Sequence, residues 1–173
     1  MTIDDVWNLN SFPIKQIYQQ LRGVFQKVTW RKLVCNNLGC PKWIFILTLV
    51  ANERIHTRDR LEKWGITNDT ECPLCENAVE SIDHLFFSCR FSQAIWRRLL
   101  KWQRINRQPM QWSDELNWAV TNASGNSIAA QIFRIVLAGT VYFVWQERNQ
   151  RIFQAKHRAS NQTNHSRCSL SRE

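Results

Sequence analysis

Apolar positions along the chain recur mainly at helical spacing. Residues 14–28 show this spacing after a helix start that Ser11 and Pro13 favour, because a proline in the first turn needs no backbone donor. Residues 43–51 form an apolar run that is too short to span a membrane. The run favours a buried helix, although a buried strand would show the same signature. Because no alternation of period two persists, the sequence predicts a mainly α fold.

Further helices are predicted downstream. Thr57 suits the N-cap of a short helix over residues 58–64, and Gly65 suits its C-terminal stop. Residues 128–156 predict a last helix that is apolar on nearly all sides in its middle part. The uninterrupted apolar stretch of this helix is too short for a bilayer crossing, so we expect it to be buried against the rest of the domain.

Four potential metal ligands fall close together in the middle of the chain. Their spacing is C-x2-C-x8-H-x4-C, and they are Cys72, Cys75, His84 and Cys89. A tight turn, helped by Pro73, is the usual way in which a Cys-x2-Cys pair presents two sulfurs to one ion. Zn²⁺ prefers thiolate and imidazole ligands in a tetrahedron, and four protein ligands leave no position for water. The pattern therefore predicts one structural zinc rather than a catalytic zinc.

Two other interpretations of this motif stay open at this point. Cysteine is often buried without a metal, so the group could be three buried thiols and a surface histidine. A Cys72–Cys75 disulfide would leave Cys89 unexplained, and no secretory signal places the chain in an oxidising compartment. The remaining cysteines are widely separated and suggest free thiols in a reducing, intracellular compartment. They are Cys35, Cys40 and Cys168.

Charge is distributed unevenly around the motif. The chain of 173 residues has a net charge of +9, which points to a polyanionic partner or a basic tail. Residues 72–89 contain acidic side chains and no Lys or Arg, whereas residues 90–107 contain basic side chains and no acid. The helix predicted after Cys89 has an apolar face that we expect to dock on the core, and a basic side left for solvent or phosphate. The apolar face comprises Phe91, Ile95, Leu99 and Trp102, and the candidate nucleic-acid contacts are Arg90, Arg97, Arg98, Lys101 and Arg104.

The motif and its surroundings resemble a known family. The residues that carry the resemblance are WRKLV at 30–34, PKWIF at 41–45, TRDRL at 57–61, CPLC at 72–75, HLF at 84–86, and Arg54, Glu80, Cys89 and Trp96. They resemble the zinc-binding domain that follows the reverse transcriptase in plant non-LTR (LINE-type) retroelements, and WQERNQRIF at 145–153 is similar to a segment further downstream in those proteins. The resemblance implies zinc ligation by Cys72, Cys75, His84 and Cys89 and a role in handling RNA or target DNA. One departure is Thr48, where family members often have tryptophan.

On this basis the sequence predicts a small helical domain built around one zinc knuckle, with a further C-terminal helix. The expected segments are a helical lead-in (1–24), the zinc-binding domain (25–104), a linker with about one helical turn near residues 114–120 (105–127), the C-terminal helix (128–156) and a disordered Ser/Asn-rich tail (157–173).

We expect no catalysis by this chain. A reverse transcriptase needs adjacent aspartates on a strand and turn to hold two metal ions, and the Asp4-Asp5 pair has no such context. An array of carboxylates for RNase H is not evident either. The leading hypothesis is a non-catalytic module of a retrotransposon polyprotein that assists RNA or DNA binding, with no membrane partner. Phe86, Phe87 and Phe91 could stack on bases, although core packing is the simpler role.

Three alternatives remain at the level of sequence. The domain could be a zinc-stabilised docking module for a reverse transcriptase domain or a host protein. It could be a zinc enzyme, with Glu76, Glu80 or Asp83 as the general base. It could also be a retroelement remnant without a function.

Overall fold

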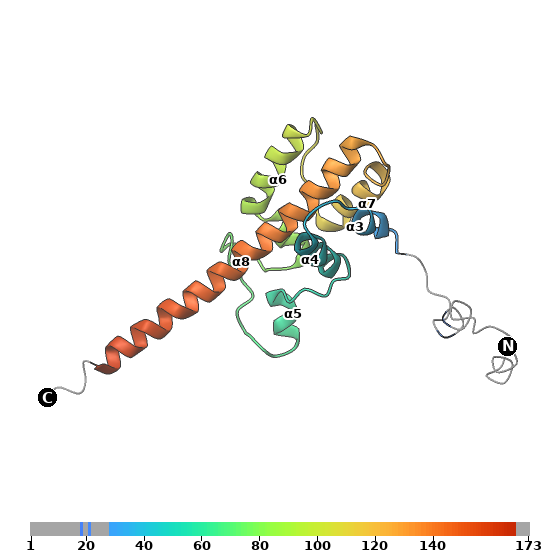
Figure 1. Cartoon of the computed structure of the whole chain (residues 1–173). Coiled ribbons are helices and arrows are strands. Elements are labelled where there is room, and N and C mark those ends of the chain that lie inside the picture. The colour runs from blue at the N-terminus through green and yellow to red at the C-terminus, as the bar shows by residue number, and fades with distance from the viewer. Residues whose placement is uncertain (1–17, 19–20, 22–27, 169–173) are drawn as a thin grey trace, which may run out of the picture.

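The fold consists of helices and connecting loops (Figure 1). The structure is a computed structural model that describes residues 18, 21 and 28–168, with side chains described as far as residue 153. Over this range it contains no strand, only an isolated bridge between Glu71 and Val79. The elements are α3 (Arg31–Cys35), α4 (Pro41–Ala51), α5 (Arg58–Lys63), the π-helical turn η1 (His84–Ser88), α6 (Arg90–Trp102), α7 (Trp112–Asn122) and α8 (Ile128–Cys168). The predicted mainly α fold is confirmed.

Helix α8 is the long axis of the molecule. Figure 1 shows the other helices gathered around its N-terminal half, while its C-terminal half projects away from them. Its main packing partner is α4, and it also contacts η1 and α6. Gly139 lies where α4 and α8 meet, and a Cβ at this position would lie 3.4 Å from the Trp43 ring. The glycine therefore lets the indole pack directly on the α8 backbone.

The predicted helices 43–51 and 58–64 are both present. Helix α4 starts with Pro41 in its first turn and buries Leu47 and Val50. Helix α5 ends before Gly65, whose φ of +68° is the left-handed conformation that favours glycine at a helix end. The departure at Thr48 leaves α4 intact, because its hydroxyl donates to the Ile44 carbonyl at 2.7 Å.

A buried aromatic cluster joins the metal motif to the C-terminal half of the chain. Phe87 stacks on Trp112 with ring centroids 5.8 Å apart and lies 5.0 Å from Trp96. Trp96 in turn packs edge-on against Phe133 of α8 at 5.7 Å. Burial of such side chains is the main driving force for folding. The segment around η1 and the later helices α7 and α8 therefore share one core.

Two predictions for the second half of the chain are wrong. Residues 112–122, expected to hold about one helical turn within a linker, form helix α7, which buries Trp112, Glu115 and Ala119. Of the tail expected to be disordered (157–173), residues 157–168 continue helix α8, and the remaining residues lie outside the described range. Extending an existing helix avoids the cost of nucleation, so polar residues can follow the apolar part of α8 without a break.

The face on which α6 docks differs in part from the prediction, because only Phe91 and Leu99 of the predicted stripe pack against the core. The buried side chains are Ser92, Trp96 and Leu100, one position along from the predicted stripe. Of that predicted stripe, Ile95 is 38% exposed and Trp102 is 67% exposed. The predicted stripe and the observed one both carry large apolar residues, and the observed stripe is the one that buries Trp96.

The predicted N-terminal helix lies mostly outside the described residues. Tyr18 and Leu21 are helical, and both side chains are exposed.

Between Ile128 and Phe153, α8 is long and apolar enough to cross a membrane by length and composition alone. Half of its most apolar stretch is buried inside the domain. The central helix of a helical domain has the same properties.

Candidate metal centre

The turn that carries Cys72 and Cys75 is closed by backbone hydrogen bonds. The Cys72 amide donates to Ala78 at 2.7 Å, and the Glu76 amide donates back to Cys72 at 2.8 Å. Glu76 has φ of +55°, which reverses the chain sharply after Cys75. The turn therefore holds the two sulfurs on the same side of the loop.

The second pair of candidate ligands comes from η1. The Cys89 amide donates to the His84 carbonyl at 2.6 Å, the wide spacing of a π-helical turn. The Ser81 hydroxyl accepts from the His84 amide at 3.1 Å and fixes the start of the turn. This geometry brings residues 84 and 89 to the same side of the turn.

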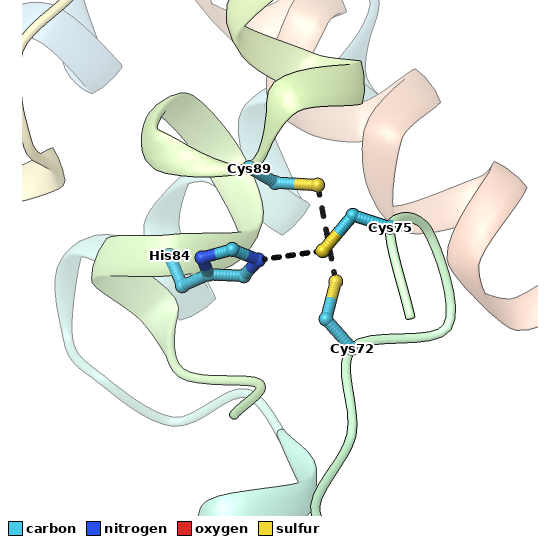
Figure 2. Close-up of side chains that lie close together, drawn as sticks. All are labelled: Cys72, Cys75, His84 and Cys89. Carbon is cyan, nitrogen blue, oxygen red and sulfur yellow. Dashed lines mark hydrogen bonds between the residues drawn. The ribbon is translucent and has the colours of Figure 1, made fainter. Parts of the chain in front are cut away.

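The four side chains converge on one point (Figure 2). Their sulfur and imidazole nitrogen atoms all lie within 4.8 Å of one another. The Cys72 and Cys89 sulfurs are 3.9 Å apart, and Cys75 Sγ lies 3.2 Å from His84 Nε2. Bonds of about 2.3 Å to sulfur and about 2.0 Å to nitrogen place neighbouring tetrahedral ligands roughly 3.5 to 3.8 Å apart. The cluster therefore has the ligand types and the approximate size of a Cys3His zinc site.

The surroundings of the cluster also suit thiolates. All three cysteines are buried, and their thiols are free rather than joined in a disulfide. The backbone amides of Leu74 and Cys75 act to lower the pKa of the Cys72 thiol, which favours its charged form. The hydrogen bond from Cys72 lowers the pKa of the Cys89 thiol, whereas that bond and burial raise the pKa of Cys72. Cys72 donates a hydrogen bond to the Cys89 sulfur, and a metal ion bound between the two sulfurs would displace that proton.

His84 also has the charge state that a metal requires. Burial lowers the pKa of its imidazole, against an opposing effect of the Glu80 carboxylate. A neutral imidazole leaves a lone pair for the ion.

The three candidate general bases lie in different surroundings. The Glu80 carboxylate is fully buried and bonded bidentately to Arg148, with N···O distances of 2.7 and 2.9 Å. Glu76 and Asp83 are exposed on the surface. A closed set of four ligands leaves no position for a reacting water.

Sequence reasoning missed the contribution of α8 to this centre. Glu80 lies just beyond the turn that carries Cys72 and Cys75, called the knuckle turn below. Its carboxylate also accepts from the Arg58 amide at 2.9 Å, and Arg148 donates to the His56 carbonyl at 3.2 Å. One buried ion pair thereby joins the knuckle, the start of α5 and the middle of α8. The segment WQERNQRIF contains Arg148, but nothing in its local pattern names a partner 68 positions away.

Two more arginines bind the backbone of the knuckle turn. Arg151 of α8 donates to the carbonyls of Pro73 and Leu74 at 3.3 and 3.1 Å. Arg90 donates to the Cys75 carbonyl at 3.3 Å. Three thiolates and one Zn²⁺ carry a net negative charge, so guanidinium groups beside the turn are favourable.

The remaining predicted basic residues lie away from the cluster. They are exposed along α6 and just beyond its C-terminal end, and they make no side-chain hydrogen bond or ion pair with any residue in the described range. They are Arg97, Arg98, Lys101 and Arg104.

The phenylalanines beside the cluster cannot act as stacking faces in this conformation. Phe86 and Phe87 are fully buried and pack against Trp112. Phe91 is half-buried under the Arg151 guanidinium, which lies 5.0 Å from its ring. Their role is core packing.

Comparison with known proteins agrees with the ligand pattern. Residues 12–96 match the family described as zinc-binding in reverse transcriptase. The matched range includes all four candidate ligands and Glu80. No curated protein and no solved structure matches the chain. Residues 12–96 of this chain are therefore similar to the zinc-binding domains of reverse transcriptase.

Proposed function

We propose that the chain is a non-catalytic module of a retrotransposon reverse transcriptase polyprotein that binds one structural zinc and assists binding of RNA or DNA. The parent element would be of the plant LINE (non-LTR) type, on the resemblance described above. The chain would act inside the cell, in a reducing compartment and without a membrane partner, beside its polymerase domain.

The observation that carries the nucleic-acid proposal is the basic side of α6. Cys89, a candidate zinc ligand, is the N-cap of this helix, so metal binding would fix the helix at its start. The exposed cations that follow carry no acidic partner within the described residues, which leaves them free for phosphate. They are Arg97, Arg98, Lys101 and Arg104.

The test removes three charges from this side of the helix. Replacing Arg97, Arg98 and Lys101 by Gln should weaken binding of single-stranded RNA or DNA. It should also reduce the magnitude of the slope of log K against log salt by about 2 to 3, because fewer phosphate contacts form and fewer counterions are released on binding. Fluorescence anisotropy over a salt series measures both quantities. The matched control replaces three exposed cations elsewhere, Arg31, Lys32 and Lys63, and should leave the slope nearly unchanged. An equal loss in both variants would contradict the assignment of the α6 surface.

A second candidate function is docking of a protein partner. An apolar groove of about 700 Å³ runs between α4, α6 and α8, with Trp43, Ile95 and Phe143 among its walls. Such grooves take apolar segments of other proteins. The same salt series separates the two functions, because binding through an apolar groove depends only weakly on ionic strength.

A further inference from the structure

We propose that a small pocket at the C-terminal end of α6 takes one unpaired nucleobase, stacked on Trp102, while the neighbouring cations hold the phosphates. This assignment rests on the proposed nucleic-acid function and names the site where a single strand would be recognised. The pocket has a volume of about 290 Å³ and is lined by Trp102, Gln103, Arg104, Ile105, Ala129 and Ile132.

Trp102 is an indole that the fold does not use. It is 67% exposed, whereas Trp96 on the same helix is fully buried and Trp112 is 5% exposed. Trp64, also exposed, contacts His56 and lies near the Arg60 guanidinium. No aromatic or cationic side chain within the described residues is stacked on Trp102. An exposed indole beside a pocket is a ready stacking surface.

The end of α6 holds this surface in a fixed geometry. Arg104 adopts φ of +60°, and its amide donates to the Lys101 carbonyl at 3.0 Å. The Ile105 amide donates to Leu100 at 2.9 Å, so the chain closes the helix end and turns back toward α8. Gln103 donates through Nε2 to the Leu99 carbonyl at 3.1 Å, and its side-chain oxygen remains to accept a bond.

Charge and size select the occupant. The pocket walls are an indole and the apolar side chains of Ile105, Ala129 and Ile132, while Arg104 lines the rim. Arg98 and Lys101 are exposed on the last turns of the same helix. An apolar pocket bordered by cations suits a base with its phosphates. The volume of about 290 Å³ lies at the small end of the roughly 300–1,000 Å³ range of ligand pockets, which suits a ligand as small as one base. A duplex keeps its bases stacked inside, so the ligand is a single strand.

The experiment compares two oligonucleotides and two tryptophan variants of the full chain with zinc bound. One oligonucleotide is an ordinary single strand, and the other has the same phosphates with abasic sites in place of its bases. Trp102→Ala should weaken binding of the ordinary strand by about 5- to 100-fold without changing the salt slope, because stacking and phosphate contacts are separate contributions. Trp64→Ala, an exposed tryptophan on α5's C-cap, should leave binding unchanged.

The abasic strand distinguishes stacking from a general loss of binding. The wild-type chain should bind it more weakly than the ordinary strand, and Trp102→Ala should not weaken it further. Ala129→Leu, which narrows the pocket from the α8 side, should reproduce the loss for the ordinary strand only. Unchanged binding by both pocket variants, or equal loss for both strands, would overturn the base pocket and leave the proposed function standing. Failure of the wild-type chain to bind either strand would overturn both.

Discussion

At the scale of single residues, the ion pair between Glu80 and Arg148 distinguishes this domain from an isolated zinc knuckle. Both side chains are buried; Glu80 also accepts from the amide of the first residue of α5, and Arg148 donates to the His56 carbonyl just before that helix. A buried pair of this kind contributes little when compared with apolar residues of the same size, but the loss of one partner leaves an uncompensated charge. The pair therefore makes the position of α8 depend on the knuckle.

Removal of Glu80 should be strongly destabilising. We expect Glu80→Ala to lower the free energy of unfolding by about 3–5 kcal/mol, because Arg148 stays buried without its partner. Urea unfolding at saturating zinc measures the effect. Glu62→Ala, at an exposed glutamate of α5, serves as the matched control and should change stability by less than about 0.5 kcal/mol. Similar stabilities of the two variants would show that the buried pair is unimportant.

The candidate ligands and their partners were not equally predictable. Cys72, Cys75, His84 and Cys89 lie within one short stretch, and the geometry of a zinc site restricts their spacing, so the sequence alone predicts that they converge. Arg148 and Arg151 reach the same centre from α8. Their partners depend on how the helices pack, which no local pattern determines.

At the scale of elements, α7 is the helix that covers the aromatic side chains beside the metal centre. It lies in the segment that the sequence predicts to be a linker, because Pro109 and many polar residues surround it. Arg107 and the buried Glu115 form a second bidentate ion pair, at 2.7 and 2.6 Å, that anchors its start. A charged residue such as glutamate is not expected at a buried position, so the sequence pattern does not predict a core helix here.

The covering role of α7 predicts a large effect at Trp112. Trp112→Ala removes the ring that stacks on Phe87 and should cost about 3–5 kcal/mol of unfolding free energy. The comparison is Trp64→Ala, where a 53% exposed ring is removed and the cost should stay near or below about 1 kcal/mol. Thermal and urea unfolding of both variants measure the difference. If Trp112→Ala lowered the free energy of unfolding by no more than Trp64→Ala, the covering role of α7 would be contradicted.

The orientation of α6 shows a second limit of sequence patterns. Its two candidate stripes are one residue apart, and the sequence favoured the one that contains Phe91 and Leu99. The structure buries Trp96 instead and leaves Trp102 outside. This rotation of the helix is what places an indole beside the exposed cations.

At the scale of the whole molecule, the zinc-binding segment and the later helices form one core. The family match ends at residue 96, yet Phe133 of α8 packs on Trp96, and Arg148 and Arg151 bind the knuckle. The fold class and the metal motif could be predicted from the sequence, because helical spacing and ligand spacing are local. The shared core could not, because it depends on contacts between distant segments.

The most direct test of this account is the zinc content of the purified chain, measured by elemental mass spectrometry together with circular dichroism. We predict one zinc per chain. Cys75→Ser should lose the metal and much of the folded structure around residues 70–100, because the binding free energy of a small structural site is also folding free energy. A wild-type chain that is folded without zinc, or a Cys75→Ser variant that keeps one zinc per chain, would contradict the four-ligand site.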